Sequence, residues 1–125
     1  MGQTILIVDD FKDYAVLLEK NLKTEGYQTK IVNDGENAIR TAKTDKPDLI
    51  LLDIMMPNIG GTEVRIELMK DVVTKNIPII FLTGLRAPRS KKKPLHDGVR
   101  VVGKSNSFTE LMQAIRETLP KPAQK

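Results

Sequence analysis

The sequence predicts a three-layer α/β/α fold, in which a five-stranded parallel sheet is covered by helices on both faces. Short apolar runs alternate with amphipathic segments along the 125 residues, which is the pattern of repeated strand and helix units. The runs at 48–52 and 77–82 are apolar except for Asp48, as is typical of strands buried on both faces of a parallel sheet. The length and the 40% hydrophobic content suit one domain. We expect this domain over residues 1–120, with a short polar tail at 121–125.

Five short apolar segments are the predicted strands: residues 4–8, 27–32, 48–52, 77–82 and 99–102. Parallel neighbours in a sheet need crossover connections, and these are right-handed in nearly all proteins. Helices must therefore cover both faces of this sheet. Ligands of such sheets bind outside the carboxyl ends of the strands, where the strand order reverses.

Helical periodicity marks the connections after the first and second strands. The expected buried stripe of the first helix is Tyr14, Leu17, Leu18 and Leu22. Gly26 stands where this helix would end, because glycine adopts the left-handed conformation that closes many helices. The second helix is shorter, stops before Pro47, and is marked by Ala38, Ile39 and Ala42.

The later helices show the same periodicity. The third helix has an expected buried stripe of Val64, Leu68 and Val72. In the last helix, Ser107 followed by Glu110 forms a capping box, and Pro120 closes the segment. Its apolar residues follow the helical spacing without interruption, and they are Phe108, Leu111, Met112, Ile115 and Leu119.

The connection between the last two strands differs from the others. Residues 85–98 have no apolar stripe and contain Pro88 and Pro94, so we expect a loop or a degraded helix there. Residues 84–100 hold six basic residues and one aspartate, a charge of +5, so the rest of the chain nets −1 of the total +4. The pI near 9.4 thus reflects the charge of this one segment and not a basic surface. We therefore expect no direct DNA binding. The basic run is either a solvated loop or a patch for an acidic partner.

The composition excludes several classes of site and location. With no cysteine and one histidine, His96, the chain has neither a thiolate metal site nor a multi-histidine zinc site. Any metal must be bound mainly by oxygen. No uncharged apolar run of about 18 residues and no signal peptide are present, so we expect a soluble cytoplasmic protein without membrane contact.

Polar residues follow four of the predicted strands at the points where those strands end. Asp9 and Asp10 follow the first strand, Asp53 the third, Thr83 the fourth, and Lys104 lies just after the fifth. The carboxyl ends of parallel strands meet at one edge of the sheet, so these side chains are expected in one crevice. Taken singly, the first two are also typical helix-capping carboxylates, the threonine an ordinary strand residue, and the lysine a solvated charge.

Three carboxylates in one crevice repel each other, by roughly 4 kcal/mol per pair at about 4 Å and an effective dielectric near 20. A cation or a proton must offset this repulsion. Carboxylate oxygens without sulfur or imidazole favour Mg²⁺ or a similar divalent ion, which uses one or two carboxylates and keeps several waters. One carboxylate then remains as a nucleophile that can accept a phosphoryl group, a reaction that needs mainly positioning and nearby cations.

Four segments together resemble the receiver domain of two-component response regulators, across nearly the whole chain. They are ILIVDD at 5–10, DLILLDIMMPNIGG at 48–61, IIFLTG at 79–84 and GKS at 103–105. The resemblance implies the CheY-like, doubly wound strand order 2-1-3-4-5. It also implies a fourth helix after the fourth strand, which this sequence degrades or replaces with a loop.

The resemblance implies a role for each residue of the crevice. Asp53 is the expected phosphoacceptor. Asp10, Asp53 and the backbone carbonyl of Met55 are expected to ligate the metal, and Asp9 to act mainly through metal-bound water. Thr83 is expected to bond the phosphoryl group. Lys104 is expected to pair with that group.

Two residues depart from the family pattern. Ser105 follows Lys104, where the family usually has proline after a cis peptide bond. A cis bond before a residue other than proline costs about 3 kcal/mol, so the placement of the lysine is in question. Val101 stands where the family usually has an aromatic residue whose inward swing reports phosphorylation. The structural response to phosphorylation is therefore less predictable than phosphorylation itself.

The implied function is a phosphoacceptor that a sensor histidine kinase or phosphotransfer protein phosphorylates and that signals to a downstream protein, as a monomer or weak homodimer. It is not an enzyme with a separate substrate. A receiver-like interaction module that works without phosphate stays open. A nucleic-acid binder using residues 86–93 has few aromatic residues for stacking. No nucleotide-binding glycine motif occurs, and DIM at 53–55 does not fit an aspartate-nucleophile phosphohydrolase.

Overall fold

The computed structural model describes residues 2–84, 95, 96 and 98–119. Its strands are β1 (Thr4–Val8), β2 (Gln28–Val32), β3 (Leu49–Asp53), β4 (Ile79–Thr83), β5 (Leu95–His96) and β6 (Val99–Gly103). They lie in the order β2-β1-β3-β4-β6-β5, and all pairs except β5 with β6 are parallel. Since β6 is the fifth predicted strand, the predicted five-stranded parallel sheet and its order 2-1-3-4-5 are confirmed.

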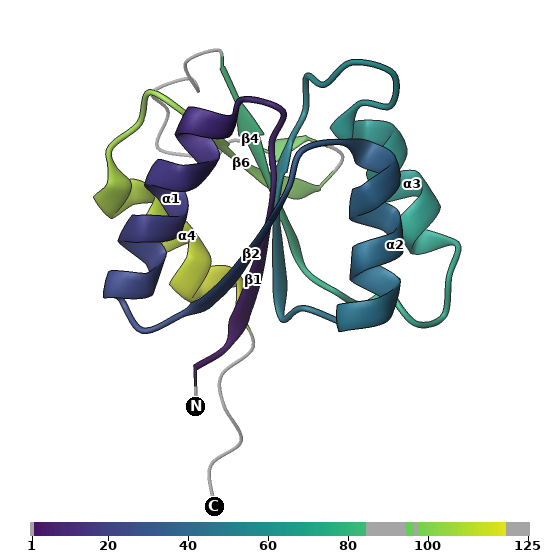
Figure 1. The fold of residues 1–125 in the computed structure, drawn as a ribbon, viewed down its shortest axis with the longest axis horizontal. Coiled ribbons are helices and arrows are strands. Elements are labelled where there is room, and N and C mark those ends of the chain that lie inside the picture. Colours follow the sequence, from purple (N-terminus) through teal and green to yellow (C-terminus); the bar gives the residue numbers. More distant parts are fainter. Residues whose placement is uncertain (1, 85–94, 97, 120–125) are drawn as a thin grey trace, which may run out of the picture.

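Four helices complete the three layers: α1 (Lys12–Thr24), α2 (Gly35–Asp45), α3 (Gly61–Met69) and α4 (Phe108–Thr118). Helices α1 and α4 cover one face of the sheet, and α2 and α3 cover the other (Figure 1). Among the described residues, no helix is long and apolar enough to cross a membrane.

Alternating residues of the central strands divide the core into two clusters. On β3, Leu49 and Leu51 pack toward α1 and α4, whereas Ile50 and Leu52 pack toward α2 and α3. All five residues of β3 are buried, which explains why this run is apolar throughout except for the aspartate at its end. The sheet thus places Asp53 at the end of a fully buried strand.

Side-chain caps begin two of the helices. The Asp34 carboxylate accepts a hydrogen bond from the Asn37 backbone N–H at 2.8 Å, at the start of α2. The Ser107 hydroxyl accepts one from the Glu110 N–H at 3.2 Å, as the sequence predicted for α4. The Glu110 carboxylate accepts from the side chain of Asn106, so it interacts with a residue outside the predicted capping pair. Gly26 follows α1 with a φ of 94°, as expected for a residue that closes a helix.

Two residues expected in helical core stripes are exposed instead. Leu17 is 54% exposed, because the buried stripe of α1 is Ala15, Leu18 and Leu22, and Leu17 lies about a third of a turn away from it. Val72 is 76% exposed, because α3 ends at Met69. The buried Thr74 explains that end, since its hydroxyl donates to the Leu68 carbonyl at 2.6 Å and the chain leaves the helix as a series of turns.

The two-residue strand β5 was not predicted. It pairs antiparallel with β6, Leu95 opposite Arg100 and His96 opposite Val99, and lies at the edge of the sheet. Periodicity cannot reveal so short a strand. The predicted loop or degraded helix covers residues 85–98, of which 85–94 and 97 lie outside the described residues, so it stays a prediction.

The loop after β3 brings two backbone segments into close contact. Gly61, the first residue of α3, donates its N–H to the Ile54 carbonyl at 2.9 Å. A Cβ at this position would lie 2.3 Å from the Asp53 carbonyl oxygen, so only glycine fits. The start of α3 is therefore held directly against the end of β3.

Candidate functional site

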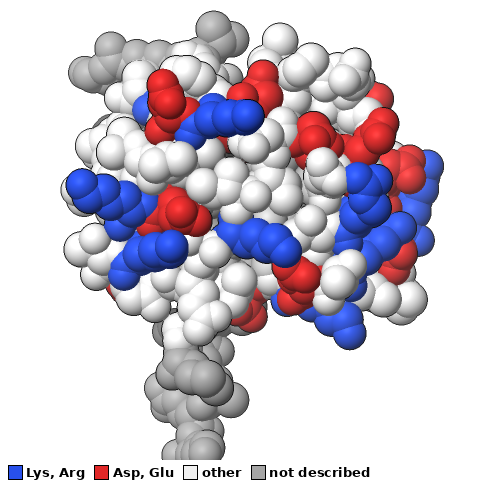
Figure 2. Space-filling view, viewed as in Figure 1, with Lys and Arg blue, Asp and Glu red and all other residues white. Residues whose placement is uncertain are grey.

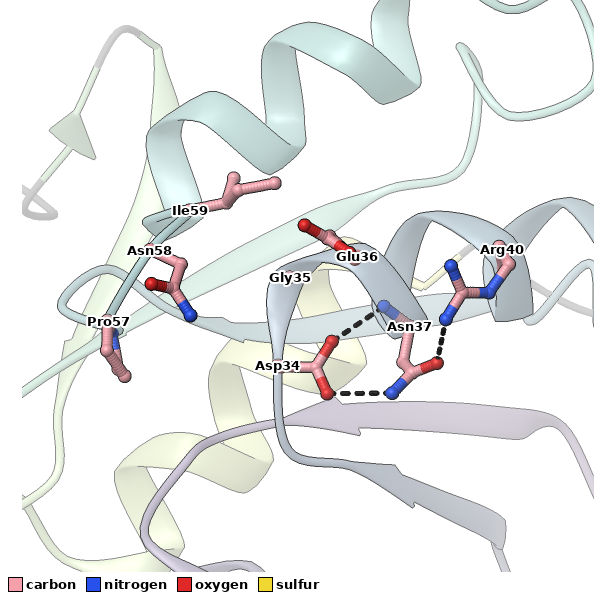
Figure 3. A pocket seen from close by; sticks show the side chains of 8 residues that line it. All are labelled: Asp34, Gly35, Glu36, Asn37, Arg40, Pro57, Asn58 and Ile59. Carbon is pink, nitrogen blue, oxygen red and sulfur yellow. Dashed lines mark hydrogen bonds between the residues drawn. The ribbon is translucent and has the colours of Figure 1, made fainter.

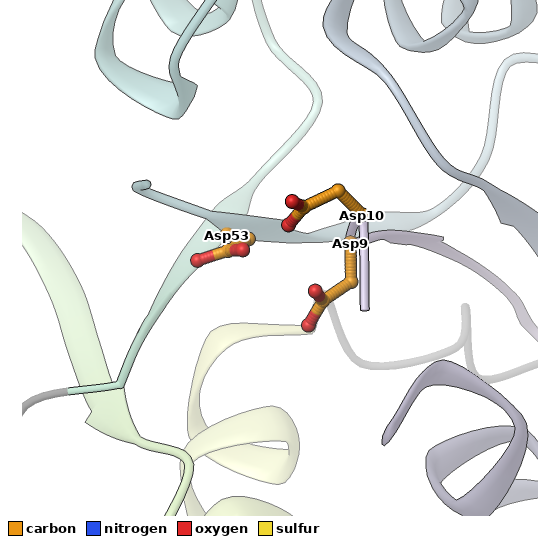
Figure 4. A group of neighbouring side chains, drawn as sticks. All are labelled: Asp9, Asp10 and Asp53. Carbon is orange, nitrogen blue, oxygen red and sulfur yellow. The ribbon is translucent and has the colours of Figure 1, made fainter. Parts of the chain in front are cut away.

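Three aspartates gather at the carboxyl ends of β1 and β3. Asp9 and Asp10 follow β1 directly, and Asp53 is the last residue of β3. Because Val8 pairs with Leu52 in register, the next residues on the two segments, Asp9 and Asp53, are neighbours. One carboxylate oxygen of each aspartate lies within 4.8 Å of those of the other two (Figure 4). Asp9 and Asp53 are buried, whereas Asp10 is exposed.

Lys104 brings a positive charge to the two buried carboxylates. Its Nζ lies 2.7 Å from Asp9 Oδ2 and 3.3 Å from Asp53 Oδ2. The lysine follows β6, and its backbone N–H donates to the Thr83 carbonyl at 2.7 Å, which extends the pairing of β6 with β4. No peptide bond among the described residues is cis. Lys104 therefore reaches the site with a trans bond to Ser105.

Hydrogen bonds fix the other oxygen of each buried carboxylate. Asp9 Oδ1 accepts from the Phe11 N–H at 2.9 Å, and Asp53 Oδ1 accepts from the Met55 N–H at 3.2 Å. The Oδ2 atoms of both residues consequently face the ammonium group. For Asp9, this contact is an ion pair without hydrogen-bond geometry, because Oδ2 is buried and has no hydrogen-bond partner among the described residues.

The site holds more negative than positive charge. Burial, followed by the neighbouring charge of Asp9, raises the pKa of Asp53 to about 6, although Lys104 opposes this rise. Burial alone would lower the pKa of Lys104, but its contacts with Asp9 and Asp53 outweigh burial and raise it. The Lys104 ammonium thus contacts two buried carboxylates and offsets their negative charge only in part.

This arrangement fits a small, hard cation. The donors are carboxylate oxygens from two neighbouring strands, and one of these oxygens is buried without a hydrogen bond among the described residues. A further positive charge would favour the ionised form of Asp53, whose pKa is raised in the absence of a metal. Asp10, the exposed member, lies on the solvent side, where a metal that keeps several waters would be accessible.

The remaining predicted residues lie beside this cluster. Thr83 ends β4 and is partly buried, with its backbone carbonyl engaged by Lys104. Met55 lies two residues beyond Asp53, with an exposed side chain and its backbone N–H directed to the Asp53 carboxylate. The roles predicted for the Thr83 hydroxyl and the Met55 carbonyl rest on the family resemblance.

The sequence analysis did not assign two residues to the site. Asn33 follows β2, and its side-chain amide donates to the Asp9 backbone carbonyl at 2.9 Å. Its position after a strand was a usable signal, because the same rule identified the aspartates. Tyr14, expected only in the core stripe of α1, places its ring 5.0 Å from Lys104 Nζ. Burial, then the charges of Asp9 and Asp53, raise its pKa to about 12.

A separate hollow of about 290 Å³ lies between the start of α2 and the loop after β3 (Figure 3). Three of its polar residues hydrogen-bond to one another: Asp34 accepts from Asn37, and Asn37 accepts from Arg40. None of the predicted site residues lines it. On the face shown in Figure 2, acidic and basic side chains are interspersed. Neither feature competes with the aspartate cluster as a site.

Two solved structures of similar fold contain magnesium. The receiver domain of the sensor histidine kinase PA1611 from Pseudomonas aeruginosa, with magnesium coordinated in its active-site cleft, matches with a TM-score of 0.79 and 29% identity. That match covers 93% of this chain and 97% of the other. The response regulator TrrA from Thermotoga maritima, in complex with Mg²⁺ and BeF, matches with a TM-score of 0.78 and 34% identity, over 92% of this chain and 97% of the other.

Two curated relatives are longer proteins. The alkaline phosphatase synthesis transcriptional regulatory protein PhoP of Bacillus subtilis is 42% identical over 83 residues, which are 66% of this chain and 34% of the relative. The response regulator PleD of Caulobacter vibrioides is 38% identical over 98 residues, which are 78% of this chain and 22% of the relative. This chain therefore spans about a third or less of the length of these relatives.

The family comparison agrees with the geometry. The family model described as the response regulator receiver domain matches residues 5–116. That range contains the three aspartates, Lys104 and all the strands of the described residues except Thr4, the first residue of β1. With this match, the strand order and the cluster at the strand ends, the chain belongs to the family of response regulator receiver domains.

Proposed function

We propose that the chain receives a phosphoryl group on Asp53 in a reaction that depends on Mg²⁺ or another divalent cation. The observation that carries this proposal is the buried Asp53 carboxylate, which lies within reach of two further carboxylates and 3.3 Å from the Lys104 ammonium. The similarity to magnesium-containing receivers supports the choice of metal. Asp9, Asp10 and the carbonyl of Met55 complete the proposed metal site.

In the proposed reaction, an Asp53 carboxylate oxygen attacks the phosphorus atom of the donor. A bond from phosphorus to Asp53 forms while the bond to the donor's leaving group breaks, and the electron pair leaves with that group. Lys104 and the Thr83 hydroxyl contact the oxygens of the transferred group, where negative charge must be compensated. A divalent ion held by the aspartates would supply further positive charge for the transferred group. Water later attacks the phosphorus atom, the bond from phosphorus to the Asp53 oxygen breaks, and inorganic phosphate leaves with the carboxylate restored.

The biological setting follows from the same proposal. The donor is a sensor histidine kinase or a phosphotransfer protein, and the phosphorylated domain acts on a downstream protein in the cytoplasm. The receiver comprises residues 1–120 and works as a monomer or weak homodimer, without direct contact to DNA or membrane. It promotes its own phosphorylation and dephosphorylation and turns over no separate substrate. The proposed tail, residues 121–125, lies outside the described residues.

The test is phosphorylation by acetyl phosphate with Mg²⁺, followed by intact-mass measurement. We expect one added phosphate in the wild type, none in Asp53→Asn, and none when EDTA removes the metal. Asp13→Asn is the matched control, because Asp13 is exposed in the first turn of α1 and lies outside the cluster. Its phosphorylation should equal that of the wild type. A wild type that gains no phosphate would refute the proposal.

A second function is favoured by one residue. Val101 is buried in the core cluster on the α2 and α3 side, so the aromatic side chain that usually reports phosphorylation is replaced by a small, packed one. An interaction module that signals without phosphate would have this property. Partner binding that is unchanged by Asp53→Asn, in a protein that does not accept phosphate, would support this alternative.

A further inference from the structure

Tyr14 is the one aromatic side chain found against the Lys104 ammonium among the described residues. It belongs to the first turn of α1 and is partly buried against the core cluster between the sheet and helices α1 and α4. Its ring centre lies 5.0 Å from Lys104 Nζ, within the range of a cation–π interaction. The ring is held by core packing, so its position does not depend on the ammonium group.

The side chain of Lys104 has few other fixed contacts. Its backbone is tied to Thr83, but four flexible methylene groups separate that anchor from the ammonium. The residue that follows is Ser105, which restrains the backbone less than proline does. Among the described residues, the ammonium also contacts the carboxylates of Asp9 and Asp53.

Both of these carboxylates change during the proposed reaction. Asp53 ceases to be a free carboxylate when it is phosphorylated, and the negative charge of Asp9 is shared once a cation is bound nearby. The attraction between the ammonium and the aromatic ring depends on the ring's quadrupole and is unaffected by either event. The ring therefore provides a contact that does not depend on the charge of either carboxylate.

We propose that Tyr14 is a positioning residue, whose ring holds the Lys104 ammonium at the place where it meets the incoming phosphoryl group. The inference rests on the proposed function and adds to it a residue for which the sequence predicted only a packing role. The ring carries the effect, so phenylalanine should replace tyrosine and an aliphatic residue should not.

Three variants separate positioning from packing. Tyr14→Phe keeps the ring, Tyr14→Leu removes it, and Tyr27→Leu removes another partly buried ring that packs against the same core cluster. We expect the rate of phosphorylation by acetyl phosphate with Mg²⁺ to fall about threefold to tenfold in Tyr14→Leu, the size expected from a cation–π contact. Tyr14→Phe and Tyr27→Leu should stay near the wild-type rate.

A spectroscopic measurement without any phosphodonor tests the contact itself. In the wild type and Tyr14→Phe, ring currents should shift the NMR signals of the Lys104 ε-methylene group, and this shift should vanish in Tyr14→Leu. Equal rates in Tyr14→Leu and the wild type would overturn the inference, as would an equal loss in Tyr27→Leu or an unshifted Lys104 signal. A wild type that shows the ring-current shift but accepts no phosphate would refute the proposed function instead.

Discussion

At the scale of single residues, the site combines burial with incomplete compensation of charge. Asp53 is 2% exposed and has a pKa of about 6, so the folded domain holds its ionised form at a cost. An added cation would relieve the repulsion between this carboxylate and Asp9 and so favour its ionised, nucleophilic form. The same property predicts how stability depends on pH.

Replacing Asp53 should stabilise the metal-free domain above pH 6. The folded-state pKa of about 6 lies above the ordinary aspartate value of 3.8, so the folded state binds this proton more tightly than the unfolded chain does. Stability of the wild type therefore falls as pH rises from about 4 through about 6. In urea unfolding with EDTA, Asp53→Asn should gain about 1–3 kcal/mol over the wild type at pH 8 and little at pH 4.

Glu25→Gln is the matched control for this measurement, because Glu25 is exposed at the end of α1. Its stability should follow that of the wild type at every pH. A difference between Asp53→Asn and the wild type that does not grow between pH 4 and pH 7 would contradict the raised pKa.

The residues of the site were largely predictable, because each follows a strand whose apolar pattern is clear. Asp9, Asp53 and Lys104 are brought together by that placement alone. The contact of Lys104 with Tyr14 was not predictable, since it depends on the path of a long side chain after a trans Lys104–Ser105 bond. Periodicity identifies the face on which a residue lies, and it does not identify the atom that the residue contacts.

At the scale of elements, the position of α1 was predicted correctly, but one residue of its predicted buried stripe is exposed. Leu17 and Leu18 are adjacent and identical in type, yet Leu17 is 54% exposed and Leu18 is 3% exposed. An apolar residue at the margin of a stripe can face either the core or the solvent, and only packing decides between them. The end of α3 shows the same limit, because the Thr74 hydroxyl that closes it acts from outside the helix.

These two leucines provide a matched pair for measuring core packing. Leu18→Ala should lower the free energy of unfolding by about 2–5 kcal/mol, because it leaves a cavity between α1 and the sheet. Leu17→Ala should change it by about 0.5 kcal/mol or less, because the side chain is largely in solvent. Chemical denaturation of both variants measures the difference. Similar losses in both would show that Leu17 is covered in solution.

At the scale of the whole molecule, metal binding and folding are linked. The aspartates that form the cluster come from two parallel strands of one sheet, so the cluster exists only when the sheet is assembled. A ligand that binds only the folded state stabilises it by about 2.7 kcal/mol when its concentration is 100 times its dissociation constant. Mg²⁺ should therefore raise the thermal unfolding temperature of the wild type and have little effect on Asp53→Asn.

The gain in unfolding temperature should depend on pH. A proton on Asp53, whose pKa is about 6 without metal, competes with the cation, so Mg²⁺ should bind about tenfold more weakly at pH 5 than at pH 7. Calorimetry suits this titration because the chain has no tryptophan to report it. An affinity that is constant between these pH values would contradict the assignment of Asp53 as a ligand.

The contact at Gly61 couples β3, the strand that ends in Asp53, to helix α3. With no room for a Cβ beside the Asp53 carbonyl, and with the Gly61 N–H bonded to Ile54, neither segment can slide past the other. A shift of the backbone at Asp53 would therefore press on the first turn of α3. Ile66 and Met69 lie further along this helix, and both are exposed. We expect a change at the buried carboxylate to reach the outer surface of α3 by this route.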